Sequence, residues 1–346
     1  MKKKNIINLI KYHVEKNEAG FNAEAYEIAK DFDYAGDTQL AEYIMTLISN
    51  ANTFVPQLKE HNSEYLDKIN SEVDMLLLPD VIMDDLLGIV NAVSHNIGIN
   101  KFLLQGAPGT GKTEAAKKLS QILERDLYIV DFATIIDSKL GQTQKNISKL
   151  FNEINSFVYP EKVIVLFDEI DAIALDRTND NDLREMGRAT SAMLRGMDYM
   201  DERIIMMATT NLYEYFDKAL TRRFDYIIDF NRYTNEDLAV IAEKMLDKML
   251  VKFKLANKDI RLFRKIINLM PTIPYPGDLR NLIKTAVAFS NPDDGMDYFR
   301  RLYYTICGEI PQDLAKLKKQ KFTVREIEIL TNKSKSSVAR KLKGGE

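Results

Sequence analysis

The stretch GAPGTGKT, residues 106–113, decides the fold of the central part of this 346-residue chain. It fits the pattern G-x-x-x-x-G-K-[ST], with the apolar run KFLLQ before it and the helical run EAAKKLSQIL after it. Its glycines allow backbone angles that bulkier residues resist, so successive N–H groups can turn inward around phosphate oxygens at a helix N-terminus. The stretch therefore predicts a strand, a phosphate-binding loop and a helix in succession. The predicted cofactor-binding residues here are Gly106, Pro108, Gly109, Thr110, Gly111, Lys112, Thr113 and Glu114.

Short apolar runs recur on both sides of this loop and alternate with helical stretches of ten or more residues. The runs are FLLQ (102–105), LYIVDF (127–132), VIVLFD (163–168), RIIMMATTN (203–211) and YIIDF (226–230). Such alternation predicts an α/β fold in which a parallel sheet is covered by helices on both faces. The expected order is a helical module at 1–50, a connector with room for one helix at 51–80, an α/β nucleotide-binding domain at 81–232, a helical domain at 233–310 and a basic helical tail at 311–346.

The run VIVLFDEID, residues 163–171, ends in carboxylates at the edge of the sheet where ligands of open α/β folds collect. Asp168 suits a Mg²⁺ ion shared with the Thr113 hydroxyl, and Glu169 suits a base that polarises an attacking water. Asn211, at the end of another strand, could hold that water. Lys112 would reach the β- and γ-phosphates.

Composition excludes several other classes of protein. The net charge of −3 is too near neutral for a chain built wholly for nucleic acid or an anionic membrane. The one cysteine, Cys307, cannot pair within the chain, and His13, His61 and His95 are widely separated, so we expect neither a disulfide-braced secreted protein nor a Cys/His metal site. The start of the chain lacks the apolar core of a signal peptide, and no window approaches ~18 apolar residues. We therefore expect a cytoplasmic protein without a membrane span.

Residues 80–310 resemble the AAA+ ATPases. GAPGTGKT is similar to the Walker A loop of that family, VIVLFDEID to its Walker B strand and ATTN (208–211) to its sensor 1 strand. The resemblance implies a Mg²⁺-dependent ATP hydrolase that assembles into a ring, most often a hexamer. It also makes 233–310 the helical lid, in which YPGDLRNLIKTA (275–286) resembles the sensor 2 helix and Arg280 would lie over the phosphates.

DKALTRRFD, residues 217–225, resembles the family's second region of homology, whose arginines act as fingers on ATP bound by the adjacent subunit. This implies that Arg222 and Arg223 are catalytic in a neighbour's site. Many members separate the two arginines, whereas here they are adjacent, so one of them could serve structure; we favour Arg223 as the main finger.

The target is less constrained. SKLGQTQKNISKLF, residues 138–151, resembles the first pore loop of protein-remodelling members, with Leu140 where an aromatic residue is usual; an ordinary connecting loop is the alternative. The N-terminal helices could dock a protein partner or brace the ring. The compact layout also resembles the ATPase members of bacterial two-gene systems that contain a subtilisin-like protease, which implies a protein target and a partner protease.

The last segment is basic. From Pro311 to Glu346 there are ten Lys and Arg residues against four acids. FTVREIEILTNKSKSSVARKL (322–342) predicts two short helices with Thr323 and Ser334 as caps, and is similar to a helix-turn-helix, although Glu328 stands where a small alanine is usual. That resemblance implies DNA contact through residues 323–342, by way of Lys335, Ser336, Ser337 and Arg340. The alternative is a basic tail that packs on the lid or docks a partner.

Overall fold

The computed structural model of the chain describes residues 3–15, 17–34, 37–48, 63–69, 76–95, 97–136, 141–174, 180–253 and 258–343. The chain divides into two compact units, Met1–Glu64 and Tyr65–Glu346. Each unit is described by itself. Within the described ranges, no helix combines the length and the apolar character needed to cross a membrane.

The described part of the first unit is helical: α1 (Lys3–Val14), α2 (Glu18–Tyr34) and α3 (Thr38–Ile48). A small core of Ala25, Ile28, Ala29 and Ala41 holds α2 and α3 together. The Asn8 amide donates a 3.0 Å hydrogen bond to Glu24 and links α1 to α2.

A six-stranded sheet with the order β1-β3-β4-β5-β2-β6 forms the centre of the second unit. The strands are β1 (Leu66–Ile69), β2 (Lys101–Gln105), β3 (Asp126–Val130), β4 (Val163–Phe167), β5 (Ile205–Thr210) and β6 (Tyr226–Asp229). All five strands expected from the apolar runs are present and run parallel to one another. The loop at 106–113 leaves the carboxyl end of β2, between β5 and β6, where the ends of β4 and β5 can meet it.

The segment 51–80, expected as a connector with room for one helix, instead contributes a strand: β1 pairs antiparallel with β3 at the edge of the sheet. Leu66 lies opposite Val130, and Tyr65 and Leu66 are buried in the core. Only one of the four strand residues is buried, so the segment does not form a continuous apolar run. The strand depends on pairing with a partner that is remote along the chain, which a local pattern does not reveal. The rest of the connector, 51–62 and 70–75, lies outside the described residues.

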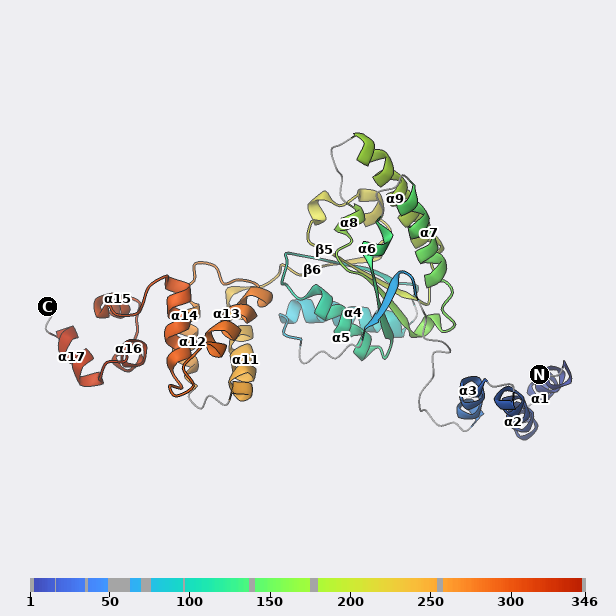
Figure 1. Cartoon of the computed structure of the whole chain (residues 1–346), viewed down its shortest axis with the longest axis horizontal. Coiled ribbons are helices and arrows are strands. Elements are labelled where there is room, and N and C mark those ends of the chain that lie inside the picture. Colours follow the sequence, from blue (N-terminus) through green and yellow to red (C-terminus); the bar gives the residue numbers. More distant parts are fainter. Residues whose placement is uncertain are drawn as a thin grey trace. The chain divides into compact units, whose positions relative to one another are not determined.

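The alternation of side chains along β4 explains the two covered faces. Ile164 and Leu166 face the core formed with α4 (Asp80–Ser94) and α5 (Lys112–Ile122). Val163, Val165 and Phe167 face the opposite core, formed with α7 (Gln142–Ile154) and α9 (Asp180–Tyr199). Figure 1 shows these helix pairs on opposite faces of the sheet. The short helices of this part are α6 (Phe132–Ile135), α8 (Asp171–Ala174), α10 (Lys218–Thr221), η1 (Pro160–Lys162) and η2 (Tyr213–Tyr215).

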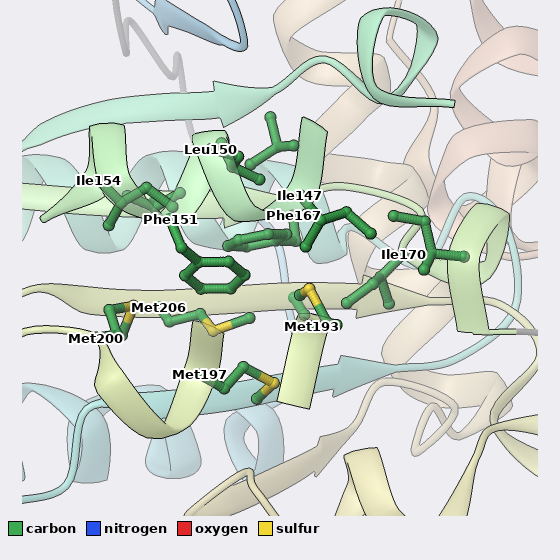
Figure 2. Close-up of a cluster of buried hydrophobic side chains, with 14 of the residues drawn as sticks. Ile147, Leu150, Phe151, Ile154, Phe167, Ile170, Met193, Met197, Met200 and Met206 are labelled. Atoms are coloured by element: carbon green, nitrogen blue, oxygen red, sulfur yellow. The ribbon is translucent and has the colours of Figure 1, made fainter. Parts of the chain in front are cut away.

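The core under α7 and α9 is rich in aromatic and methionine side chains. Phe151 of α7 stacks on Phe167 of β4, with ring centroids 5.9 Å apart. Figure 2 shows the α7 side chains on one side of this cluster and the α9 methionines Met193 and Met197 on the other. A Cβ atom added at Gly196 would lie 2.0 Å from the Phe151 ring, so α9 can approach α7 this closely only because Gly196 has no side chain.

Helices α11 to α17 share a single core. They are α11 (Asn235–Phe253), α12 (Ile260–Ile267), α13 (Pro276–Ala288), α14 (Asp297–Cys307), α15 (Leu314–Lys319), α16 (Val324–Thr331) and α17 (Lys335–Lys343). Thr234 and Asp237 cap the start of α11 reciprocally. Phe322, Ile327 and Val338 are buried in the same cluster as Tyr298 of α14. The basic tail therefore packs on the preceding helices.

Polar contacts also fasten the tail to α12 and α14. Lys265 donates to Glu326 at 2.7 Å, and the Tyr303 hydroxyl donates to Gln320 at 2.9 Å. Arg300 donates to the Ile329 carbonyl oxygen at 2.9 Å. The three-helix tail is therefore an extension of this helical region and not a separate appendage.

Candidate functional site

The loop between β2 and α5 has the strained backbone that its glycines allow. Gly109 has φ 77° and Gly111 has φ 97°, a region that favours glycine. Two contacts from the segment after β6 hold the loop: Asn231 Oδ1 accepts the Ala107 N–H at 2.8 Å, and the Tyr233 hydroxyl donates to the Thr110 carbonyl oxygen at 2.6 Å. The shape of the loop is thus fixed by a segment that is distant along the chain.

Lys112 lies at the centre of the loop and is almost fully buried. Its ammonium donates to the carbonyl oxygens of Gly106 at 2.6 Å and Ala107 at 2.9 Å, and to Asn211 Oδ1 at 2.7 Å. Burial lowers the pKa of Lys112, and the nearby carboxylates of Asp168, Asp171 and Glu169 oppose that shift. A buried cation held by neutral oxygens is well placed to attract an anionic ligand.

Asp168 lies against the start of α5. The Thr113 hydroxyl donates to its carboxylate at 2.9 Å, so these two predicted metal ligands are in direct contact. Thr209 of β5 donates to the same carboxylate at 2.7 Å and accepts the Glu169 N–H at 2.8 Å. Thr209 therefore positions both acids. Sequence reasoning missed it, because its role depends on the adjacency of β4 and β5.

Glu169 has φ 52°, an uncommon angle for a residue other than glycine. Its side chain is exposed, unlike the residues on either side of it. Strained backbone of this kind clusters at functional sites, where the surrounding structure holds it in place. The Thr209 contact to the Glu169 N–H is one such restraint.

Asp171 is a second residue that the sequence analysis missed. It is buried, accepts the Asn211 N–H at 2.9 Å and accepts the Thr210 hydroxyl. These bonds tie the end of β5 to the segment after β4 and hold Asn211 near Lys112. Asp171 is the second aspartate in DEID, a local signal that could have identified it.

The loop, the ends of β4 and β5, and helices α11 and α13 surround a cavity of about 660 Å³. The predicted residues that line it are Pro108, Gly109, Thr110, Gly111, Lys112, Thr113, Glu114, Asp168, Glu169, Asn211 and Arg280. Gly106 is not part of the lining, although its carbonyl oxygen accepts the Lys112 ammonium. The other lining residues include two apolar groups that were not predicted: Leu76, Leu77 and Leu78 before α4, and Met245 and Met249 of α11.

The start of α13 contacts the loop backbone directly. The Gly277 N–H donates to the Gly109 carbonyl oxygen at 2.8 Å. A Cβ atom at Gly277 would lie 2.8 Å from the Gly109 Cα, so this approach requires glycine. The contact places Arg280, one turn further along α13, in the lining of the cavity.

Arg222 and Arg223 lie apart from this cluster and do not line the cavity. Both side chains are exposed at the end of α10. Arg223 forms an ion pair with Asp198 of α9 through two contacts of 2.7 and 3.2 Å. Arg222 makes no ion pair with any residue in the described ranges. Leu140, predicted for a pore loop, lies outside the described residues.

The family model named ATPase family associated with various cellular activities (AAA) matches residues 102–232. The chain is 30% identical over 167 residues to a putative 26S proteasome regulatory subunit homolog of Methanothermobacter thermautotrophicus, covering 47% of this chain and 44% of the relative. It is 34% identical over 144 residues to proteasome-activating nucleotidase 1 of Halobacterium salinarum, covering 39% and 35%. The chain thus spans less than half the length of these curated relatives.

Among solved structures, a chain of the E. coli MS115-1 HORMA:CdnC:Trip13 complex is similar, with a TM-score of 0.55 and 17% identity. The match covers 72% of this chain and 97% of that chain. At this identity the likeness concerns the fold alone. The family match includes the loop, both strand ends and the two arginines described above. Residues 102–232 therefore form an AAA ATPase domain.

Proposed function

We propose that the chain binds Mg²⁺-ATP in this cavity and uses its hydrolysis to remodel a protein target. The observation that carries the proposal is the single cluster of Lys112, Thr113, Asp168, Glu169 and Asn211 at the loop. Lys112 and Arg280 would neutralise the phosphates. The triad Leu76–Leu78 and the α11 methionines offer an apolar place for the base, since ligand pockets bury most of a ligand against such side chains.

The oxygens of Thr113 and Asp168 suit Mg²⁺, a hard cation that is commonly held by one or two protein ligands together with phosphates and water. Bound there, the ion would neutralise charge on the phosphate oxygens. Glu169 would accept a proton from the attacking water, and Asn211 would orient that water. Thr209 and Asp171 act through these residues and are positioning residues.

We assign the action of the α10 arginines to a neighbouring subunit, because both are exposed and neither lines the cavity of its own chain. This corresponds to a ring, most often a hexamer in this family. The ion pair between Arg223 and Asp198 favours a revision of the sequence-based preference: Arg222 is the main finger, and Arg223 positions α10 on α9.

A protein target is supported by two relatives whose names refer to the proteasome. A partner protease for this chain remains part of the proposal. In this proposal, helices α1–α3 of the first unit dock the protein target. Ile7, Ile10 and Val14 of α1 are exposed and offer an apolar surface for that contact.

The direct test compares Lys112→Ala with Glu169→Gln. The first variant should lose ATP binding, whereas the second should bind ATP normally and hydrolyse it about 10²–10⁴-fold more slowly. Equilibrium binding of a fluorescent ATP analogue and steady-state phosphate release separate the two effects. Glu202→Gln, a change at an exposed acid that does not line the cavity, is the control. Unchanged hydrolysis in Glu169→Gln would contradict the assigned chemistry.

A further inference from the structure

The acids of the three-helix tail α15–α17 are all engaged in helix capping within its described part. Asp313 accepts the N–H groups of Ala315 and Lys316 at the start of α15, at 2.9 and 3.1 Å. Glu326 accepts the Thr323 N–H at 2.6 Å in the capping box of α16. Each of these contacts satisfies N–H groups that a helix start leaves without an intrahelical partner.

Glu328 likewise caps a helix, α17. Its carboxylate accepts the Lys335 N–H at 3.0 Å and so caps α17 across the turn. Glu326 also pairs with Lys265 of α12 and is only 7% exposed. The carboxylates of the tail therefore accept hydrogen bonds from backbone N–H groups, and one of them also pairs with Lys265 of α12.

Among the basic side chains of the tail that the structure describes, all but one lack such partners. Lys316 is the exception and pairs with Glu309 at 2.5 Å. The other basic side chains are exposed or half-exposed, and none forms an ion pair with a residue in the described ranges: Lys318, Lys319, Lys321, Arg325, Lys333, Lys335, Arg340 and Lys341. These eight residues are called the open cations below. Their charge is uncompensated although the whole chain is slightly acidic.

The same surface offers little to an apolar partner. In the described part of the tail, no large apolar side chain is exposed, and the last one before it is Ile310. Val338 of α17 and Phe322 before α16 point into the shared core. A surface with many cations and no apolar anchor suits the regular, water-exposed phosphates of a nucleic acid better than the interior of a lipid bilayer or an apolar peptide.

We infer that α15–α17 bind the phosphate backbone of duplex DNA through the open cations, without reading base sequence. The uncompensated charge and the absence of exposed large apolar side chains in the described tail carry this inference, which is independent of ATP hydrolysis. Binding should be strongly salt-dependent, because each neutralised phosphate releases condensed counterions. The tail shares its core with α11–α14, so charge variants of the full chain are better probes than a chain that ends before Pro311, which would expose that core.

The experiment uses the full chain and a labelled duplex of random sequence, about 30 base pairs long, in fluorescence anisotropy across roughly 50–200 mM salt. The test variant carries Lys318→Gln, Lys319→Gln, Arg340→Gln and Lys341→Gln. A matched control removes four exposed cations elsewhere, through Lys4→Gln, Lys162→Gln, Lys244→Gln and Lys284→Gln. ATP hydrolysis without DNA shows that both proteins remain folded.

We expect the test variant to bind DNA at least about tenfold more weakly. Its dependence on salt should also be shallower, by about 0.9 in logarithmic slope for each phosphate that the tail no longer neutralises. The control should bind like the unaltered chain. Equal weakening in both variants would mean that total charge, not the tail, determines binding, and would overturn the inference. So would binding to vesicles containing about one-third phosphatidylserine without binding to DNA. Failure of ATP hydrolysis in the unaltered chain would concern the cavity alone.

Discussion

The cavity and the tail use opposite charge arrangements. In the cavity, three carboxylates surround one buried cation, Lys112, and neighbouring hydroxyls and amides hold them in place. In the tail, three carboxylates cap helices and leave eight cations open to solvent. The same residue types therefore serve different ends. Where the charge is buried and fixed by other parts of the chain, it can act on a small ligand; where it is exposed and unpaired, it can meet an extended anion.

The two arginines of α10 repeat this difference within one dipeptide, because Arg223 has an ion-pair partner in the described part of the chain and Arg222 has none there. Arg222→Ala should reduce ATP turnover about 10³-fold or more, since a finger stabilises charge in the transition state. Arg223→Ala should have a smaller effect and should resemble Asp198→Ala, which breaks the same ion pair. Steady-state turnover measures both.

The control for this pair is Lys218→Ala, which removes another exposed cation from α10. Mixing Arg222→Ala subunits with Glu169→Gln subunits should partly restore hydrolysis if the finger acts on a neighbour. A larger loss in Arg223→Ala than in Arg222→Ala would reverse the assignment of the two residues.

Thr209→Val tests whether the acids of the cavity depend on their supporting hydroxyl. The change leaves the Glu169 N–H without its acceptor, a loss that costs about 1–3 kcal/mol for a buried group. Turnover should fall about 10- to 100-fold while ATP affinity changes little, because Thr209 touches the acids and not the loop. Thr209→Ser keeps the hydroxyl and should restore most of the activity. Equal defects in both variants would show that the hydroxyl is not the important group.

The attachment of the tail should weaken in acid. Burial of Glu326 acts to raise its pKa, but the hydrogen bonds from Lys265 and Thr323 outweigh that effect and lower the pKa below the usual range of a glutamate. A group with a lowered folded-state pKa stabilises the fold fully above its unfolded pKa and loses that contribution as the pH falls through the folded value. The tail should therefore loosen below the ordinary glutamate pKa.

Hydrogen exchange of the α16 amides, corrected for intrinsic rates, would follow this loosening. Glu326→Gln should lower protection at neutral pH, on the order of the 1 kcal/mol typical of one helix cap, and should flatten its decline in acid. Glu309→Gln, which removes a surface partner of Lys316, should leave both unchanged. An unchanged pH profile in Glu326→Gln would contradict the role of this carboxylate.

The smallest effect is expected at Glu328, an acid that lies among the open cations in sequence. Glu328→Gln keeps an oxygen that can accept the Lys335 N–H and removes one negative charge. DNA affinity should rise about two- to fivefold, the range expected for one charge beside a helix terminus. The same change at the exposed Glu202 should have no effect. Weaker DNA binding in Glu328→Gln would mean that the cap matters more than the charge.

The sequence predicts the parts of this fold that local patterns control. Continuous apolar runs identified the five parallel strands, and the glycine pattern identified the loop. The edge strand β1 was missed because it lacks a continuous apolar run and its partner is remote. Thr209 and Asp171 were missed for a related reason: each acts across β4 and β5, which are adjacent in the sheet but separated along the chain. Leu76–Leu78 line the cavity together with methionines of α11, a helix that is remote along the chain, so the sequence did not reveal this contact.

In the tail, sequence reasoning recognised the Thr323 cap. The turn between α16 and α17 lies at Asn332, which has the positive φ of 54° that asparagine tolerates. Sequence reasoning noted Glu328 only as a residue that stands where a small alanine is usual. The carboxylate instead turns to the N-terminus of α17, a contact that the spacing of the two helices makes available. Residue size alone did not indicate that direction.

The methionine-rich layer under α7 and α9 also provides a spectroscopic means of observing the site. Met206 lies on β5 three residues before Thr209, and Met193 and Met197 pack in the same cluster as Phe167, the residue before Asp168. Methionine methyl groups give sharp signals in large assemblies, and nearby aromatic rings spread their chemical shifts. Isotope-labelled methyls at these positions would therefore report nucleotide-dependent movement of β4 and β5 from within the core, without a bulky probe attached to the protein.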